Sequence, residues 1–403
     1  MPLLRTRRTL VTIPVTAVLL GLTPAGSPAD ASAAADTALT LLVSRGRAPA
    51  AALLIREETG TRYVHAEAVP DTTPSLPWTA QGSDTTSVRG APAEPDVTSV
   101  PRSPAASGAV SAPAAGSRAG AAIRSGDHFR AGSITKTFLA TVVLQLAAEH
   151  RLSLSDSVAE HLPGLVHGAG NDGRALTLRA LLTHTSGLYD FTAETRGDVP
   201  VTPLQALRIA FTHPPAHRGR FAYSNTNYVL LGLVVRQVTG HSYAIEVRRR
   251  VLTPLRLTGT SFPGARVFLP SPHGRAYAAD GSDVTELDPR VAGAAGELVS
   301  TLPDLNRFYA ALLGGELLPP ALLREMLDTR TAQGSYGMGL YPVTLPCGIT
   351  VWGHNGRISG SYVRTAATAD GRRVLTFRVN TDGLADADLE PALLAAEFCP
   401  RTS

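Results

Sequence analysis

Ser133 and Lys136 are the two residues of this sequence whose types and spacing most clearly suit chemistry. They stand in Ser133-Ile134-Thr135-Lys136, and residues i and i+3 share one face of a helix, so the lysine amine can reach the serine hydroxyl. A serine becomes nucleophilic when a neighbouring base takes its proton, which a desolvated lysine can do near neutral pH and an arginine cannot. Lys136 is the single lysine among 37 basic residues, which indicates that its amine is kept for chemistry. The plainer alternative is a solvated lysine beside a helix-capping serine.

Two further groups of residues add to this pair. Tyr223-Ser224-Asn225 precedes a predicted helix, where a phenol can relay protons and an amide can hold a substrate amide. His354-Asn355-Gly356 ends a predicted strand, where a glycine lets a substrate backbone lie along the strand edge beside a hydrogen-bonding side chain. A capping loop and a strand-end turn are the alternatives for the two groups.

Three other patterns predict no chemistry. Gly168 to Gly173 matches G-x-G-x-x-G, but no strand leads into it, so we expect a loop and not a dinucleotide site. Gly240 to Ala244 resembles a nucleophile elbow, yet a helix precedes it, and Gly240 as a C-cap with Ser242 as the next N-cap explains it better. The 11 histidines include no H-E-x-x-H, and we expect neither a metal nor a cofactor.

The three motifs occur in a fixed order, with Leu181-Leu182-Thr183-His184-Thr185-Ser186-Gly187-Leu188 between the first two. In this the sequence resembles the class C β-lactamase and serine D-alanyl-D-alanine carboxypeptidase family, from about Ala50 to the C-terminus apart from residues 70–122. The resemblance implies an α/β domain with a helical domain packed on it and an active site in the cleft between them. It also implies the acyl-enzyme mechanism that peptidases, β-lactamases and esterases share.

The same resemblance implies a role for the principal residues. Ser133 would be the acylated nucleophile, and Lys136 and Tyr223 would share the roles of general base and proton shuttle. Asn225 would bind an amide of the substrate. His354, where lactamase-like members carry a lysine, would assist Tyr223 and bind near the substrate carboxylate.

The strand that carries His354 would complete the site. The resemblance implies an oxyanion hole made by the backbone N–H groups of Ser133 and Arg357. Gly356 would leave the strand edge open to the substrate. Asn355 stands where many relatives have threonine or serine, so Arg357 is the alternative group for holding a carboxylate.

Hydrophobic periodicity predicts the elements that must position these residues. Strands are expected at both ends of the chain and helices between them, which indicates an α+β fold: one antiparallel sheet built from both chain ends, flanked by helices, with an inserted helical domain. The expected strands are 50–57, 61–69, 350–357, 361–368 and 372–380, with a hairpin turn at Asp370-Gly371. The expected helices are 133–151 (half-buried), 177–183, 203–212, 226–239 and 386–399.

The chain divides into segments of different character. Residues 1–33 read as a signal peptide, with arginines at the start, an apolar run over Leu10–Leu22 and a small-x-small cleavage signal at Ala31-Ser32-Ala33. Residues 70–122 are rich in proline and small residues and predict a disordered insertion. The α/β domain is then expected at 34–69, 123–155 and 275–403, and the helical domain at 156–274.

Composition and cysteine usage agree with an exported globular protein. The chain has 403 residues, 44% hydrophobic, with a formal charge of +4, and three of its arginines lie in the leader, so the rest gives little electrostatic support for nucleic-acid binding. No later apolar run is long enough for a membrane span. Cys347 and Cys399 are the only cysteines, an even pair that predicts a disulfide in an oxidising compartment.

These observations favour an exported, secreted or wall-associated serine hydrolase. Its expected substrates are peptides ending in D-Ala-D-Ala, cleaved as by a carboxypeptidase, with β-lactams acylating the same serine and peptidoglycan as a possible partner. An esterase, a D-amino-acid amidase or a β-lactamase of the same fold are the alternatives. A protein that binds muropeptides or penicillin without turnover is the alternative of a different class.

Overall fold

The computed structural model describes residues 28–58, 60–68 and 123–400. The expected disordered insertion and most of the expected signal peptide lie outside these ranges. A helix, α1 (Pro28–Ser44), overlaps the last residues of the expected leader. Periodicity did not reveal this helix, which is short on large apolar residues over its first half.

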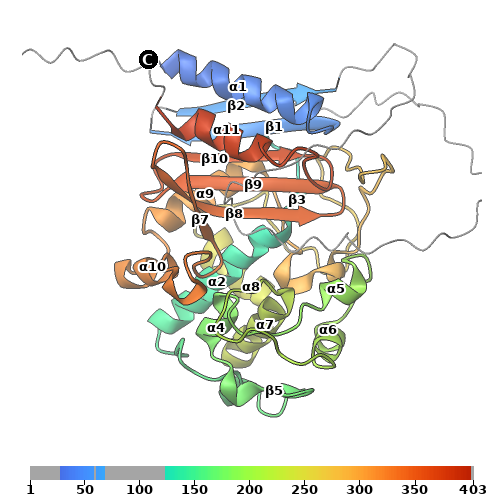
Figure 1. Ribbon diagram of the computed structural model, residues 1–403, viewed down its shortest axis with the longest axis vertical. Coiled ribbons are helices and arrows are strands. Elements are labelled where there is room, and N and C mark those ends of the chain that lie inside the picture. The colour runs from blue at the N-terminus through green and yellow to red at the C-terminus, as the bar shows by residue number, and fades with distance from the viewer. Residues whose placement is uncertain (1–27, 59, 69–122, 401–403) are drawn as a thin grey trace, which may run out of the picture.

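A six-stranded antiparallel sheet forms the upper part of the molecule, in the order β2-β1-β10-β9-β8-β7 (Figure 1). Its strands are β1 (Ala50–Glu57), β2 (Gly60–Glu67), β7 (Tyr341–Thr344), β8 (Thr350–Ile358), β9 (Ser361–Thr368) and β10 (Val374–Val379). Because β1 pairs with β10, the two ends of the chain meet in one sheet, as the sequence predicts. The short edge strand β7 was not predicted.

The two faces of the sheet are buried by different helices. Leu53 and Ile55 of β1 pack with α1 and α11 (Leu389–Phe398), whereas Ala52 and Leu54 point to the other face and its larger core. That second core includes Phe138 of α2 (Thr135–Ala148), stacked on a ring of α9 (Leu302–Leu313). Alternating residues of one strand therefore serve two hydrophobic cores.

Helices fill the lower part of the molecule (Figure 1). They are α3 (Val158–His161), α4 (Leu178–Leu182), α5 (Thr192–Thr195), α6 (Pro203–Ala210), α7 (Asn225–Thr239), α8 (Tyr243–Val247) and α10 (Pro320–Met326), whose Glu325 bonds to Arg179 of α4. Gly240 ends α7 with a φ of +77°, and Ser242 caps α8 by accepting the Ile245 N–H, as expected. Two short strand pairs lie outside the main sheet: β3 (Phe129–Arg130) with β6 (Val299–Ser300), and β4 (His167–Gly168) with β5 (Asn171–Asp172).

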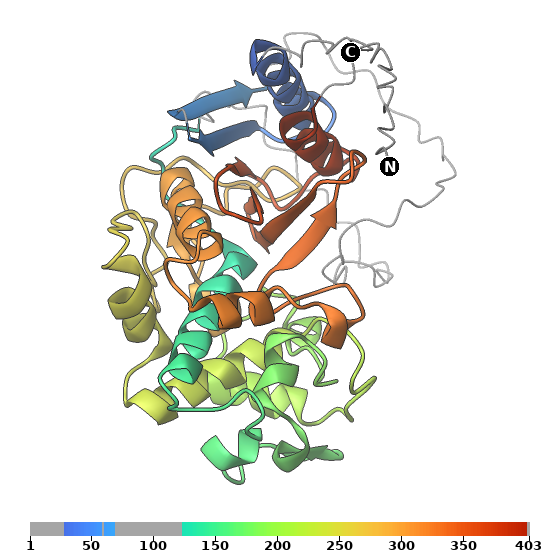
Figure 2. The same cartoon turned by 90° about the vertical axis from the view of Figure 1, so that its left-hand side faces the viewer.

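Helix α2 lies centrally between the sheet and the lower helices (Figure 2). The expectation of a half-buried helix is wrong here, because Thr135 through Leu144 are all buried. The reason is that α2 has neighbours on all sides, with α7 and α8 below and the helix α9 between it and the sheet. This places the start of α2, and with it the Ser133 motif, inside the molecule.

Candidate active site

Ser133 lies in a 3₁₀ turn, Gly132–Ile134, that leads directly into α2. Gly132 has a φ of +51°, a conformation that favours glycine. The Thr135 hydroxyl donates to the Gly132 carbonyl at 2.7 Å and accepts the Leu298 N–H at 3.0 Å. These bonds tie the turn to the segment before β6, so the position of Ser133 is fixed by its own backbone and by a distant loop.

Lys136 is fully buried beside Ser133. Its Nζ lies 2.9 Å from Ser133 Oγ, 2.8 Å from Asn225 Oδ1 and 2.8 Å from the Ala295 carbonyl oxygen. The two carbonyl oxygens can only accept hydrogen bonds, so they take N–H donors from the amine in either protonation state. In the neutral amine they thereby leave the lone pair free to be directed toward Ser133 Oγ, which is the geometry that proton transfer from serine requires.

The orientation of the Asn225 amide is fixed by two residues that the sequence analysis missed. Asn225 Nδ2 donates to Asp190 Oδ2 at 3.0 Å and to Thr192 Oγ1 at 3.1 Å, which turns Oδ1 toward Lys136. Burial raises the pKa of the Asp190 carboxyl, and hydrogen bonds from Thr192 and the charge of Lys136 oppose this rise. Both amide hydrogens of Asn225 are thus engaged within the protein. The signal that could have found Asp190 is its position two residues after the Leu181–Leu188 segment.

Tyr223 joins the site from the loop before α7. Lys136 Nζ lies over its ring, 4.8 Å from the centroid. The imidazole of His184 stacks on the Tyr223 ring, with 4.2 Å between the ring centroids. The centroid of the His354 ring lies 6.4 Å from that of Tyr223. The phenol of Tyr223 and the imidazole of His354 therefore come from segments far apart in sequence and meet the Ser133–Lys136 pair at the start of α2.

His354 lies on β8 and is buried, with both ring nitrogens engaged inside the protein. Its Nδ1 bonds to the Asn355 carbonyl oxygen, so this nitrogen carries the proton and Nε2 accepts from the Tyr336 hydroxyl at 2.7 Å. Burial and, after it, the charge of Lys136 hold the pKa of His354 well below its usual value. The imidazole is therefore neutral, the Asn355 carbonyl fixes its tautomer, and Tyr336, which sequence reasoning did not single out, holds Nε2.

Asn355 and Arg357 alternate with His354 along β8, so their side chains point to the opposite face. Asn355 is half-buried and Arg357 is exposed, with its Nε near Gly383. The structure thus brings the backbone of these two residues to the site and directs their side chains away from the face that His354 occupies.

The backbone of β8 lies directly against the turn that carries Ser133. β7 pairs with β8 only up to Gly353, so the edge beyond it is open to this turn. A Cβ added to Gly356 would lie 1.9 Å from the Ala131 carbonyl oxygen, and one added to Gly132 would lie 2.8 Å from the Arg357 nitrogen. Glycine is therefore required at both positions for this close approach.

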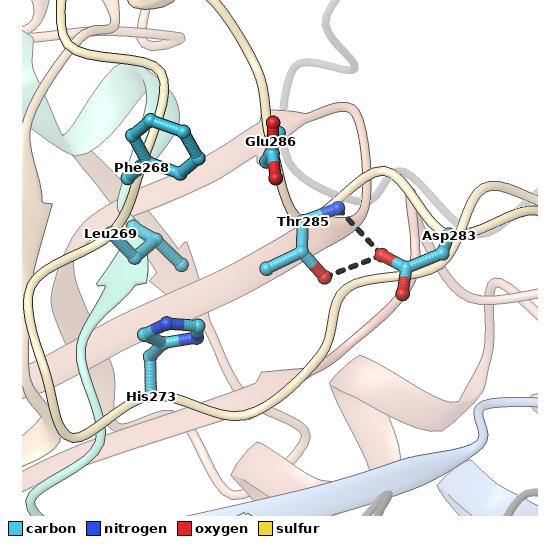
Figure 3. A pocket seen from close by; sticks show the side chains of 6 residues that line it. All are labelled: Phe268, Leu269, His273, Asp283, Thr285 and Glu286. Atoms are coloured by element: carbon cyan, nitrogen blue, oxygen red, sulfur yellow. Dashed lines mark hydrogen bonds between the residues drawn. The ribbon is translucent and has the colours of Figure 1, made fainter.

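Two other features of the described residues lie apart from these side chains. The structure joins Cys347 and Cys399 in a disulfide, with 5.8 Å between their Cα atoms. A cavity of about 480 Å³ is lined by Phe268, Leu269, His273, Asp283, Thr285 and Glu286 (Figure 3). None of the residues expected to act lies in its wall, and Asp283 is already bonded to Thr285.

Over residues 28–58, 60–68 and 123–400, no cluster of three or more histidine, cysteine, aspartate or glutamate side chains is arranged to hold a metal ion. In the same ranges no helix has the length and apolar character needed to cross a membrane.

Comparison with known proteins identifies the family. The Beta-lactamase family matches residues 48–398, and the chain belongs to this family. A D-stereospecific amidohydrolase from Streptomyces sp. is similar over 91% of this chain and 98% of its own, with 35% identity and a TM-score of 0.71. A penicillin-binding protein homologue from Pyrococcus abyssi shares the fold at 20% identity, with a TM-score of 0.65 over 91% of this chain and 77% of its own.

Curated relatives match shorter stretches. Penicillin-binding protein 4 of Amycolatopsis lactamdurans is 31% identical over 264 residues, 59% of this chain and 68% of the relative. A putative penicillin-binding protein, PbpX, of Bacillus subtilis is 29% identical over 217 residues, so the match spans about half (53%) of each chain. The predicted family and the α+β fold are confirmed, and the chain is a member of a family of serine hydrolases.

Proposed function

We propose that this protein is a serine amidohydrolase that cleaves amide bonds of D-amino-acid compounds through an acyl-enzyme on Ser133. The observation that carries the proposal is the contact of Lys136 Nζ with Ser133 Oγ, held by the two carbonyl acceptors on Asn225 and Ala295. A buried amine oriented in this way is suited to take the serine proton. We assign this step to Lys136, whose Nζ lies 2.9 Å from Ser133 Oγ.

In the first half of the reaction, Ser133 Oγ attacks the substrate carbonyl carbon and its proton passes to Lys136 Nζ. The carbonyl oxygen becomes an oxyanion, for which the backbone N–H groups of Ser133 and Arg357 are the donors that the close approach of β8 supports. Tyr223, next to the amine, donates its hydroxyl proton to the leaving nitrogen as the carbon–nitrogen bond breaks and takes the proton held by the Lys136 ammonium in its place, which restores both side chains. Water then attacks the ester, and the same groups act in reverse to release the acid and restore Ser133.

The chemistry around His354 favours substrates whose leaving group is uncharged. A peptidase for free C-termini must bind a carboxylate, which a cation does best. The imidazole of His354 is neutral and engaged on both nitrogens, and the Arg357 side chain lies on the opposite face of β8. The similarity to a D-stereospecific amidohydrolase points the same way. We therefore place D-amino-acid amides first among the substrates.

A D-alanyl-D-alanine carboxypeptidase is the second candidate. It is favoured by the curated relatives named penicillin-binding proteins, which also support β-lactams as acylating agents. Export to the cell surface, with peptidoglycan peptides as partners, belongs to this proposal and rests on the arginine-rich, apolar N-terminal segment.

The test compares two products from one enzyme preparation. We expect ammonia from D-phenylalaninamide at a rate at least tenfold above D-alanine release from an N-acylated D-Ala-D-Ala peptide, and no product from either with Ser133→Ala. The reverse preference would assign the carboxypeptidase. Arg174→Gln is the control: it should leave amide hydrolysis within about twofold of native, because its side chain is exposed and pairs with Asp172, away from the site.

Labelling by a fluorescent penicillin separates the remaining alternatives. Label that is lost in Ser133→Ala, without turnover of amide, peptide or ester, would assign a penicillin-binding protein without hydrolytic activity. Label that persists in Ser133→Ala would remove Ser133 from the mechanism.

A further inference from the structure

His184 is a buried histidine that the proposed mechanism does not use. It lies after α4 in the Leu181–Leu188 segment, is fully buried, and has a φ of +55°, in the left-handed region that few residues besides glycine adopt and that asparagine, aspartate and histidine adopt more often than the others. We propose that His184 is a positioning residue that holds the Tyr223 ring in place for proton transfer. This inference rests on the proposed function, because it concerns the same reaction.

His184 contacts the residue on each side of Tyr223 as well as Tyr223 itself. Its backbone carbonyl accepts the Ala222 N–H at 2.9 Å, and its Nδ1 accepts the Ser224 N–H at 3.1 Å. The imidazole stacks on the Tyr223 ring, with 4.2 Å between centroids and 27° between planes. One residue thus fixes the backbone before and after Tyr223 and also restricts the rotation of its ring.

The hydrogen bonds of His184 define its tautomer. Nδ1 accepts from Ser224 N–H and from the Asn227 amide at 3.1 Å, so the proton is on Nε2. Nε2 is buried and has no hydrogen-bond partner among the described residues. The edge of the imidazole meets the Tyr336 ring, 4.9 Å away at 74°. A ring held in this way has no route for passing a proton, which leaves packing against Tyr223 as its contribution.

His184 is also uncharged. Burial lowers the pKa of His184 most, and the positive charge of Lys136 and the electrostatic interaction with the His354 ring lower it further, so this pKa lies well below its usual value. A neutral ring adds no charge next to Lys136 and excludes water from one face of Tyr223. A leucine could exclude water, but it could not accept the Ser224 N–H, so this position combines two requirements that few side chains meet.

The test is a double-mutant cycle on kcat and KM with D-phenylalanine 4-nitroanilide. His184→Asn keeps an acceptor near the Nδ1 position and tolerates the positive φ, while it removes the stacked ring. We expect kcat to fall about 30- to 100-fold with KM within threefold, and Tyr223→Phe to lower kcat by about 10²–10³. Since His184 acts through Tyr223, the double variant should stay within threefold of Tyr223→Phe.

A histidine in a similar setting provides the matched control. His213 stacks on Tyr189 at 3.7 Å, outside the contacts of Tyr223, and His213→Asn should leave kcat within twofold of native. If His184→Asn does not fold, as judged by its melting curve, Asn227→Ala replaces it in the cycle. Asn227→Ala removes one hydrogen-bond donor to the His184 imidazole. It should lower kcat about fivefold in the native background and have no further effect in Tyr223→Phe.

The outcomes separate this proposal from the proposed function. Losses that multiply in the double variant, or a loss that falls on KM alone, would overturn the positioning role and leave the Ser133 chemistry standing. A Tyr223→Phe variant with nearly native kcat would overturn the role of Tyr223 itself and with it both proposals for this residue.

Discussion

Replacing Lys136 by arginine tests the reasoning about the active site most directly. The positive charge stays, but a guanidinium does not give up its proton in a protein, so it cannot act as the base for Ser133. General-base catalysis contributes about 10²–10⁴ in rate, and we expect kcat to fall about 10³-fold, which is about 4 kcal/mol in the barrier.

Because Lys136 is fully buried, a guanidinium could also act by crowding the site. Lys136→Met controls for this, since methionine has a similar length and no charge. It leaves Asn225 Oδ1 and the Ala295 carbonyl without their lysine donor, which costs about 1–3 kcal/mol of stability for each acceptor that stays unpaired. We expect a folded protein with a lower melting temperature and a rate as low as that of Lys136→Arg.

Hydrolysis of D-phenylalanine 4-nitroanilide, followed beside thermal melting, measures both effects. Either variant within tenfold of the native kcat, while folded, would refute a proton-transferring lysine.

Three further predictions concern the rest of the structure. Gly356→Ala should lower kcat about 10²-fold or more, because its Cβ would lie 1.9 Å from the Ala131 carbonyl oxygen and push β8 away from the oxyanion site. A native kcat in this variant would contradict the close packing of β8 against the Ser133 turn. Cys399→Ser should lower the unfolding free energy in urea by about 4 kcal/mol, because it opens a 52-residue loop, and leave kcat near native. The pKa values of His184 and His354 in the folded protein lie below the unfolded value near 6.5, so between these values only the unfolded chain binds the two protons. The free energy of unfolding should therefore fall as the pH drops below about 6.5, by about 1.4 kcal/mol per pH unit for each histidine. A free energy of unfolding in urea that stays constant from pH 7 to 5.5 would contradict this.

Regular local patterns made several elements predictable. Strands β1, β8 and β9 and helix α7 lie within one residue of their expected positions, because each carries its own periodicity and end signals such as Gly240. The expected hairpin turn at Asp370-Gly371 indeed joins β9 to β10. Helices α1, α9 and α10 and strand β7 were missed. The alanine-rich α1 and the four-residue β7 have weak patterns and depend on the sheet they contact, whereas α9 carries regular apolar spacing that the expected helices left out.

Some contacts of the candidate active site could be predicted from the sequence, and others could not. Helical spacing alone places Lys136 next to Ser133, and the 2.9 Å contact agrees with it. Other features of the site depend on contacts between residues that are distant in sequence. These are the bond from the Asn225 amide to Asp190, the bond between Tyr336 and His354, and the stacking of His184 on Tyr223. Such contacts have no local pattern that a reader of the sequence could recognise.

The sequence by itself determined which reactive groups this protein has, the pairing of hydroxyl and amine on one helical turn, and the sheet built from both chain ends. Only the tertiary structure decided what surrounds them: which acceptors orient the amine, which face of β8 each side chain takes, and which histidines are buried without charge. The physical reason is that short-range spacing follows from backbone geometry, whereas burial and hydrogen-bond partners arise when distant segments pack together.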